Sequence, residues 1–358
     1  TRLATLEGGR GCTVASSGHA AQVLALFPLM SPGAEIVAAS RLYGGSLQQM
    51  KNTYPKFGWT ANIVDADTPD NFKRAVTDRT KAFFIESLAN PGGVISDIEA
   101  IARIAEDAGV PLLVDNTLAT PWLCKPIDHG ATLVVHSTTK FLSGTGTSMG
   151  GAVVDSGKFD WSRGGQFPSL AGPEPAYHGL NFYETFGDMA YTFHSHAVGL
   201  RDLGPTQAPF NAWLTMLGME TLGLRMERHC ANALAVAQHL EKHPAVAWVN
   251  YAGLPSNKYN ALAKKYLPKG AGSVFTFGVK GGYDVGVKVV DSVELFSHLA
   301  NIGDAKSLII HPASTTHRQL SEEQRVAAGA GPDVLRLSIG IETVADIIAD
   351  LDQALEKA

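Results

Sequence analysis

The chain has 358 residues, of which 45% are hydrophobic and 18% are charged, with a net charge of -5 at pH 7 and a pI near 6.2. This length exceeds that of one ordinary core and predicts two domains. The acidic balance lacks the basic footprint of a nucleic-acid-binding protein, so no nucleic-acid partner is expected. No apolar run is long enough to span a bilayer, so no membrane association is expected.

Strand-length apolar runs alternate with helical patterns over the first half of the chain. Helices are expected at 18–27 and 98–108, the second ending at Gly109. Because the runs are apolar on both faces, they predict an α/β fold, in which a mostly parallel central sheet has helices on both faces and carries the site at its strand ends. The expected strands are 36–39, 62–64, 82–85, 112–114, 133–135 and 152–154.

The second half of the chain indicates a smaller α+β domain. A long helix rich in alanine and leucine is expected at 217–243, strands at 274–279 and 334–339, and a closing helix at about 345–355. We place the boundary inside the long helix. This gives a large domain of residues 1–225 and a small C-terminal domain of residues 226–358.

The three cysteines and the start of the chain bear on its compartment and completeness. Cys12, Cys124 and Cys230 are scattered and form no CxxC pair. No disulfide framework or zinc site is therefore expected, and a reducing compartment such as the cytoplasm is favoured. Residues 1–9 have the pattern of a helix end that stops at glycine, without a start methionine. We therefore expect a further N-terminal segment to precede Thr1.

A lysine and an acid follow two of the expected strands. Lys140 follows the strand at 133–135 and a run of hydroxyl residues that includes Ser137 and Thr139, and Asp115 ends the strand before it. A lysine can form an imine with an aldehyde cofactor while an acid keeps a pyridine nitrogen protonated, so the pair fits pyridoxal phosphate (PLP) chemistry. The two hydroxyls could bind the cofactor phosphate. The ordinary alternatives are a solvated lysine and a turn or cap carboxylate.

Further candidates lie earlier in the chain. Gly18 and His19 stand at an expected helix start, where bare backbone N–H groups and the helix dipole favour an anion. The alternative is that Ser17 simply caps the helix. Tyr43 precedes two glycines and could lay its ring over a flat cofactor, or it could pack in an ordinary turn.

Two residues are candidate substrate ligands. Asn90 lies in a segment whose polar groups could face a site, although an Asn-Pro turn is the plainer reading. Arg336 lies inside an apolar strand, where it could bind a carboxylate bidentately or form a structural ion pair. His311 and His317 lack further ligands nearby, so no metal site is expected.

In chain order, these motifs resemble the Cys/Met-metabolism family of PLP-dependent enzymes, which have fold type I. The likeness runs from Leu6 to the C-terminus, and its most specific parts are VDNT at 114–117 and STTK at 137–140. The resemblance implies that Lys140 is the Schiff-base lysine, Asp115 the pyridinium partner, and Tyr43 a ring-stacking and proton-transferring residue. The phosphate binders that it implies are Gly18, His19, Ser137 and Thr139, and the substrate-carboxylate binders are Asn90 and Arg336.

Within the family, the segments 177–180, 295–304 and 307–317 resemble O-acetylhomoserine sulfhydrylases. The resemblance implies that sulfide displaces acetate from O-acetyl-L-homoserine to give L-homocysteine for methionine biosynthesis. It also implies a homotetramer built from two active dimers, with an N-terminal arm that reaches the neighbouring subunit's phosphate.

Other activities stay open. A γ-lyase or a cystathionine γ-synthase would use the same lysine and acid, although Gly45 stands where methionine γ-lyases carry a cysteine. A nicotinamide-dependent oxidoreductase is a remote alternative, because the glycines at 144–150 do not follow a strand and do not match GxGxxG.

Overall fold

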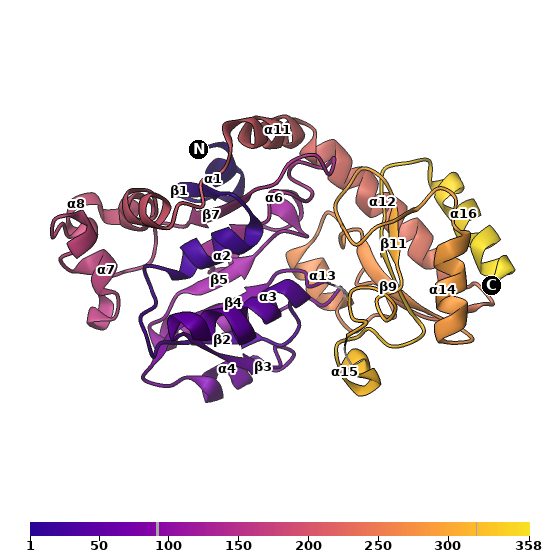
Figure 1. The fold of residues 1–358 in the computed structure, drawn as a ribbon, viewed down its shortest axis with the longest axis horizontal. Coiled ribbons are helices and arrows are strands. Elements are labelled where there is room, and N and C mark those ends of the chain that lie inside the picture. Colours follow the sequence, from indigo (N-terminus) through magenta and orange to yellow (C-terminus); the bar gives the residue numbers. More distant parts are fainter. Residues whose placement is uncertain (91–92, 320) are drawn as a thin grey trace. The chain divides into compact units, whose positions relative to one another are not determined.

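The computed structural model describes residues 1–90, 93–319 and 321–358, and these form two compact units (Figure 1). The first unit comprises Thr1–Ser87, Ser96–Thr139 and Thr147–Met216, and the second comprises Leu88–Ile95, Lys140–Gly146 and Leu217–Ala358. The domain boundary at residue 225 stays a prediction, because compactness alone does not show which segment folds independently.

The first unit is built on a seven-stranded sheet with the strand order β1-β7-β6-β5-β4-β2-β3. Strand β7 runs antiparallel to both of its neighbours, β1 and β6, and all other neighbouring strands are parallel. The predicted mostly parallel α/β sheet is therefore confirmed. The strands are β1 (Gly11–Ala15), β2 (Glu35–Ala39), β3 (Thr60–Val64), β4 (Thr80–Glu86), β5 (Leu112–Asp115), β6 (Leu133–His136) and β7 (Gly151–Asp155).

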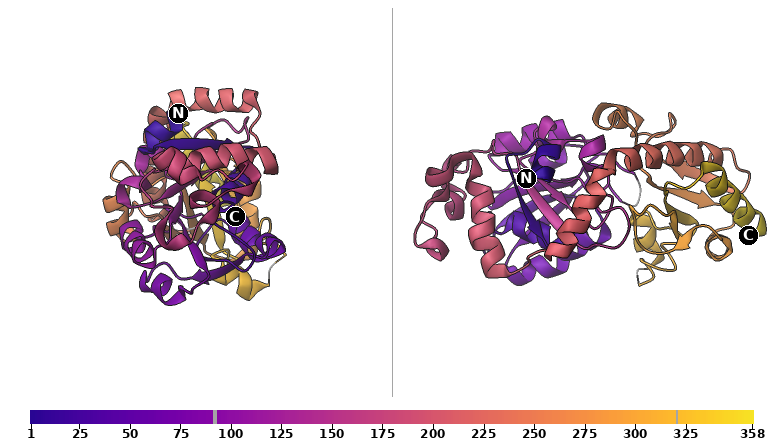
Figure 2. Two further views of the ribbon diagram at one scale, coloured as in Figure 1. Left: turned by 90° about the vertical axis from the view of Figure 1, so that its left-hand side faces the viewer. Right: turned by 90° about the horizontal axis from the view of Figure 1, so that it is seen from above.

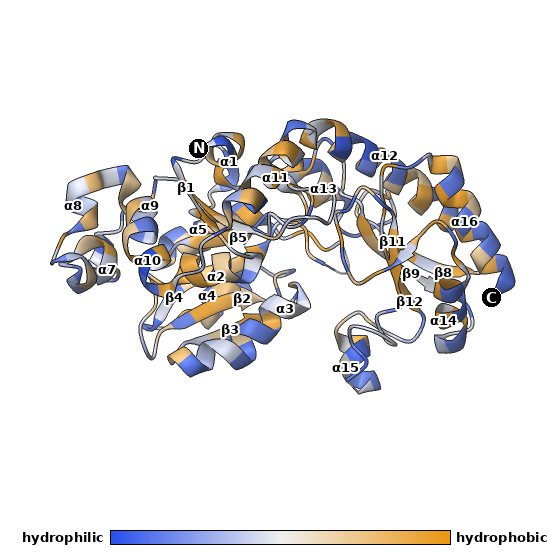
Figure 3. Ribbon diagram, turned by 45° about the horizontal axis from the view of Figure 1, so that its top comes forward, coloured by the Kyte–Doolittle hydropathy of each residue, from blue (hydrophilic) through white to orange (hydrophobic). Residues whose placement is uncertain are grey.

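Helices cover this sheet on both sides, which explains why its central strands are apolar throughout. Every residue of β2 and β7 is buried, and Figure 3 shows much of the sheet in the orange of hydrophobic residues. Helix α2 packs on β1, β6 and β7, and α5 packs on β5. The helices of this unit are α1 (Arg2–Glu7), α2 (Gly18–Leu26), α3 (Gly44–Gln48), α4 (Asp70–Ala75), α5 (Ile98–Ala108), α6 (Thr120–Leu123), α7 (Pro168–Ala171), α8 (Phe182–Phe186), α9 (Ala190–His194) and α10 (Arg201–Leu203).

Capping residues fix the ends of these helices as the sequence predicts. The Ser17 hydroxyl accepts a hydrogen bond from Ala20 N at 3.1 Å and caps α2. Helix α5 has the predicted bounds and ends at Gly109, whose φ of 69° is the left-handed conformation that glycine favours. Helix α1 ends in the same way at Gly8.

The second unit contains a five-stranded sheet with the order β10-β11-β12-β9-β8. Only the β10–β11 pair is parallel. Figure 2 shows the same elements in two further views, with the long helix α12 in salmon. The elements are α12 (Leu222–Leu240), α13 (Asn260–Tyr266), α14 (Tyr283–Ser292), α15 (Glu322–Ala327), α16 (Val344–Lys357), β8 (Val246–Asn250), β9 (Val274–Val279), β10 (Ser297–His298), β11 (Leu308–Ile310) and β12 (Val334–Ser338).

The single long helix expected at 217–243 is wrong in one respect. The structure has two helices, α11 (Pro209–Glu220) and α12, separated at Thr221. Thr221 has φ -106° and ψ 7°, outside the helical range, and its N–H donates to Gly218 O. The Arg225 guanidinium also donates to Gly218 O, at 2.6 Å, so that carbonyl is withdrawn from the regular helical pattern. Across the described ranges, no helix has both the length and the apolar character to cross a membrane.

Candidate active site

Asp115 ends β5 and is held by its own loop. Its Oδ1 accepts a hydrogen bond from Thr117 N at 2.9 Å, and its Oδ2 lies 3.4 Å from Gln22 Nε2 on α2. The Thr117 hydroxyl in turn accepts from Ser137 N at 2.8 Å, which ties this loop to the end of β6. The structure therefore brings the predicted Asp115 and Ser137 to neighbouring strand ends.

The start of α2 and the residues after β6 form a cradle of backbone and hydroxyl groups. A Cβ atom on Gly18 would lie only 2.7 Å from Cβ of Ser137, so only glycine allows this close approach. The backbone N–H groups of Gly18 and His19, at the start of α2, favour an anion there. The Thr139 hydroxyl contacts the backbone of Gly150, with Oγ1 3.1 Å from its N and 3.2 Å from its O. The predicted phosphate binders Gly18 and Ser137 therefore lie side by side.

Tyr43 presents its ring beside this cradle. The side chain is 49% exposed, and its ring stacks on that of His19 with centroids 5.8 Å apart. The backbone N of Tyr43 donates to Glu86 Oε1 at 2.6 Å, which anchors the tyrosine to the end of β4. Burial lowers the pKa of His19, and Asp115 opposes that shift, so the imidazole is mainly neutral at neutral pH. A side chain at Gly45 would overlap the rings of Tyr43 and His19.

These residues of the first unit fit PLP. The cofactor needs a carboxylate for its pyridine nitrogen, an anion site for its phosphate and a flat ring partner. Asp115 can serve the nitrogen, Gly18 and Ser137 the phosphate, and Tyr43 the ring. The close approach of Gly18 to Ser137 supports this fit, because it brings the start of α2 and the Ser137 hydroxyl together.

Lys140, Asn90 and Arg336 meet within the second unit. Lys140 Nζ donates to Asn301 Oδ1 at 2.5 Å, and Arg336 donates to Asn301 O at 3.1 Å and to Asn90 Oδ1 at 3.4 Å. Burial and the positive charge of Arg336 both lower the pKa of Lys140. More of this amine is therefore neutral, and able to act as a nucleophile or base, than of a solvated lysine. The Asn-Pro turn predicted here involves Pro91, which lies outside the described residues.

Asn301 is the residue that sequence reasoning missed. It lies in the segment 295–304 on which the family resemblance partly rests, but a single asparagine in a loop has no periodic or motif signal. Its side chain contacts the lysine and its backbone contacts Arg336, so it links two predicted site residues.

The turn after Lys140 is held by a buried arginine. Arg225 Nη1 donates to Phe141 O at 2.8 Å, and the guanidinium packs so closely on Gly144 that a side chain there would overlap it. Gly144 has φ 75°, and its carbonyl accepts from Ala305 N at 2.9 Å. These contacts fix the backbone on the C-terminal side of Lys140.

His229 gives this turn a pH-dependent support. Its buried ring packs edge-on against Phe141 with centroids 5.3 Å apart, and Nδ1 lies 2.6 Å from Ile339 O. Burial lowers the pKa of His229 to about 4 from 6.5. Between these values the unfolded chain binds more protons than the folded one, so acidification from pH 6.5 to 4 removes stability, on the order of 3 kcal/mol for this group.

We expect that loss to disappear in His229→Gln. The buried Asp155, with its pKa raised to about 7, has the opposite sign, because its contribution is lost as the pH rises towards 7. The measurement is therefore the difference in unfolding free energy between wild type and variant from pH 7 to pH 4. A constant difference would contradict the assignment.

The described part of the chain contains neither a metal-binding cluster nor a disulfide. No group of three His, Cys, Asp or Glu side chains there could hold a metal ion, and the three cysteines are free. His311 contacts Ser314 Oγ at 3.0 Å and Pro332 O at 2.8 Å.

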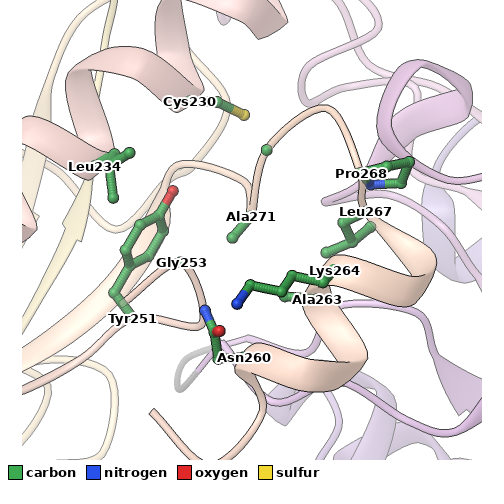
Figure 4. A pocket seen from close by; sticks show the side chains of 11 residues that line it. Cys230, Leu234, Tyr251, Gly253, Asn260, Ala263, Lys264, Leu267, Pro268 and Ala271 are labelled. Atoms are coloured by element: carbon green, nitrogen blue, oxygen red, sulfur yellow. The ribbon is translucent and has the colours of Figure 1, made fainter. Parts of the chain in front are cut away.

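A cavity of about 280 Å³ lies elsewhere in the second unit (Figure 4). Asn260 and Lys264 of α13 reach towards it, opposite Tyr251 and Cys230. None of the predicted site residues lines it, so it is separate from the chemistry described above.

The chain is similar to known proteins over almost its whole length. Residues 1–356 match the family described as Cys/Met metabolism PLP-dependent enzyme. An O-acetyl-L-homoserine sulfhydrylase of Leptospira meyeri is 49% identical, with 99% of this chain and 82% of that protein covered. A homocysteine synthase of Schizosaccharomyces pombe is also 49% identical, with 100% of this chain and 84% of that protein covered.

A solved structure agrees with these relatives. An O-acetylhomoserine (thiol)-lyase of Campylobacter jejuni, whose crystal contains a pyridoxyl-lysine phosphate, superimposes with a TM-score of 0.96 at 42% identity and covers 99% of this chain and 85% of that one. With this fold and the match over residues 1–356, the chain belongs to the Cys/Met metabolism family of PLP-dependent enzymes.

Proposed function

We propose that the protein catalyses γ-replacement on O-acetyl-L-homoserine. Sulfide forms the new C–S bond at Cγ, the C–O bond to acetate breaks, and the products are L-homocysteine and acetate. This reaction supplies homocysteine for methionine biosynthesis. The names of the relatives from Leptospira meyeri and Schizosaccharomyces pombe support the reaction. The observation that carries the proposal is the half-buried Lys140 amine, held by Asn301 beside the Arg336 guanidinium.

Lys140 is the proposed cofactor-binding lysine and proton carrier. Bound PLP supplies an electron sink for the carbanion that forms when the substrate Cα loses its proton. The lowered pKa of Lys140 leaves a neutral amine available to take that proton at Nζ. Asn301 Oδ1 keeps Nζ in one position by accepting its hydrogen bond.

The remaining residues of the first unit are proposed to bind and orient the cofactor. Asp115 holds the proton of the pyridine nitrogen, and its Thr117 contact fixes the carboxylate direction. Gly18, His19 and Ser137 bind the phosphate through backbone N–H groups and the serine hydroxyl, and we assign Thr139 to the same group. Tyr43 covers the ring and helps to move protons.

Arg336 and Asn90 are the proposed partners of the substrate α-carboxylate. A guanidinium can bind a carboxylate with two parallel hydrogen bonds, and Arg336 is 9% exposed, so the pair would be largely desolvated. The Asn90 side chain lies beside the same guanidinium and can add a hydrogen bond.

We expect Arg336→Ala to raise KM roughly ten- to more than a hundredfold, because a charge-assisted hydrogen bond contributes about 1.5–3 kcal/mol. Arg336→Lys keeps the charge but loses the planar fork, so it should fall between wild type and alanine. Steady-state kinetics with varied O-acetyl-L-homoserine measures the effect, and PLP content controls for a loss of cofactor. An unchanged KM in a variant that retains PLP would remove the assignment.

A product assay tests the reaction itself. Purified protein is incubated with O-acetyl-L-homoserine and PLP, with and without sulfide, and the products are separated. We expect homocysteine and acetate in equal amounts only when sulfide is present. Release of 2-oxobutanoate and ammonia from methionine at comparable rates would show a γ-lyase instead. Preferential use of cysteine in place of sulfide would show a cystathionine γ-synthase. Gly45 argues against the lyase, because methionine γ-lyases carry a cysteine at this position.

We also propose a cytoplasmic homo-oligomer, a tetramer of two active dimers. The three free cysteines suit a reducing compartment. Helix α11 exposes Phe210, Trp213 and Met216, with 64%, 52% and 46% of each side chain accessible. These residues recur at helical spacing on one helix and form an apolar face of the kind that subunit contacts cover. Sedimentation of the purified enzyme measures the state, and a monomer would contradict this proposal.

A further inference from the structure

A chain of buried polar side chains lies on the face of the first sheet opposite Asp115. Glu86 pairs with Asp115, and Asp115 pairs with Val135, so these three side chains share one face. Because side chains alternate along a strand, the next residues, Ser87, Asn116 and His136, face the other way. The ends of β4, β5 and β6 therefore carry polar residues on both faces.

Glu7 of helix α1 joins the residues of the back face. Its Oε1 accepts from Asn116 Nδ2 at 2.8 Å and lies 2.5 Å from His136 Nε2. Asn116 Oδ1 accepts from the Ser87 hydroxyl at 2.7 Å, and Asn116 Nδ2 also donates to Cys124 O at 2.9 Å. Glu7, Asn116 and His136 are fully buried, and Ser87 is 1% exposed. We name Glu7, Ser87, Asn116 and His136 the strand-end network.

Ser87, Asn116 and His136 lie at or just after a strand end, and each is the chain neighbour of a residue on the site face. Ser87 follows Glu86, which anchors the Tyr43 backbone. In the same way, Asn116 follows Asp115, and His136 precedes Ser137. Adjacent residues share a peptide unit. A backbone shift at any of these back-face residues is therefore transmitted to the neighbouring site residue.

Stability alone is a poor explanation of this network. Burying a carboxylate, an imidazole and an amide costs desolvation energy, and apolar residues of similar volume often replace such groups without loss. Glu7 Oε2 and His136 Nδ1 also have no hydrogen-bond partner among the described residues. These two atoms cost stability, while the hydrogen bonds that Glu7 Oε1 and Asn116 do make hold the strand ends in place.

We propose that the strand-end network sets the spacing between Asp115 and Ser137, and thereby the fit of PLP between its pyridine nitrogen and its phosphate. The inference rests on the proposed roles of those two residues. The pyridine ring of PLP is rigid and carries its phosphate on a short arm, so the partners of its nitrogen and its phosphate must be held at a nearly constant separation, to within about 0.5 Å for a preorganised site. Glu7 holds both strand ends through a single oxygen atom, which makes it the central positioning residue.

The chain offers a matched control. Glu174 and His194 form a second buried Glu–His pair in the same unit, with Oε2 and Nε2 3.3 Å apart. Neither residue adjoins Asp115 or Ser137 in the sequence. Glu7→Ala and Glu174→Ala therefore remove the same group from similar surroundings, and only the first disturbs the strand ends.

The experiment measures the PLP affinity of each holoenzyme, by the rate of cofactor loss on dilution and by rebinding, together with its thermal midpoint. We expect Glu7→Ala to weaken PLP binding roughly ten- to a hundredfold, as the loss of supporting contacts does in metal sites. Glu174→Ala should lower the midpoint and leave PLP affinity within about twofold of wild type. Glu7→Gln keeps an acceptor oxygen for both partners and should restore most of the affinity.

Equal PLP affinity in folded Glu7→Ala and wild type would overturn the proposal, and so would equal losses in both alanine variants. If Glu7→Ala does not fold, Ser87→Ala removes only the outer hydroxyl, and unchanged PLP affinity in that variant would also overturn it. Asp115→Asn distinguishes failure of the proposed site assignment from failure of the network inference. If it leaves PLP binding and activity intact, the site assignment itself is wrong. If it impairs them while Glu7→Ala does not, only the network inference fails.

Discussion

Lys140→Ala is expected to abolish the visible absorbance of the lysine-bound cofactor and to lower kcat more than roughly a thousandfold. The variant loses both the amine proposed to link to PLP and the proposed base for the Cα proton. The fold should persist, because the backbone of the following turn is held by Arg225 and Ala305 rather than by the lysine side chain. Absorbance spectra, turnover and the thermal midpoint measure the three outcomes.

A surface lysine provides the control for this substitution. Lys288 lies exposed on α14, so Lys288→Ala removes the same charge without touching the proposed site. We expect it to behave as wild type. A borohydride-stable link between PLP and a different lysine in Lys140→Ala would contradict the assignment.

Asp115→Asn should be the second most damaging change, with a loss of kcat on the order of a hundredfold or more. Asparagine has the same shape, and its oxygen can still accept from Thr117 N, so the loop should stay in place. The negative charge that favours the protonated pyridine ring is lost. Asp115→Glu keeps the charge in an altered position and should retain more activity than the asparagine variant.

Turnover and the absorbance of the protonated cofactor ring measure this effect. Thermal unfolding of both variants shows whether the loop has been preserved. Wild-type activity in Asp115→Asn would refute the role of the carboxylate.

The sequence predicts most of the first sheet because its central strands are buried on both faces. Strands β2, β4, β5, β6 and β7 contain continuous apolar runs, whereas the run in β3 is short and only partly buried. Strand β1 was missed, since Gly11 and Cys12 begin a five-residue segment that is only partly apolar. Its pairing with β7 joins residues that are far apart in the chain, and no local pattern encodes that pairing.

The candidate site is predictable at the positions where a charged residue stands in an apolar segment. A charge lies after or within an apolar strand at three positions, Lys140, Asp115 and Arg336. Such a charge is costly to desolvate, so its presence indicates a partner or a ligand. Asn301 and Glu7 were not predictable as partners, because their contacts depend on tertiary packing. Glu7 meets His136, 129 positions along the chain, and only the folded structure shows that the pair shares a face with Asn116.

The composition of the second unit limits how the enzyme can be dissected or recombined. Leu88–Ile95 and Lys140–Gly146 belong to this unit although they are interrupted by segments of the first. A fragment that starts at Leu217 would lack Lys140 and would leave the Arg225 cation without the Phe141 carbonyl. No single proteolytic cut can therefore release this unit whole, and a chimera with a relative must exchange all three of its segments together.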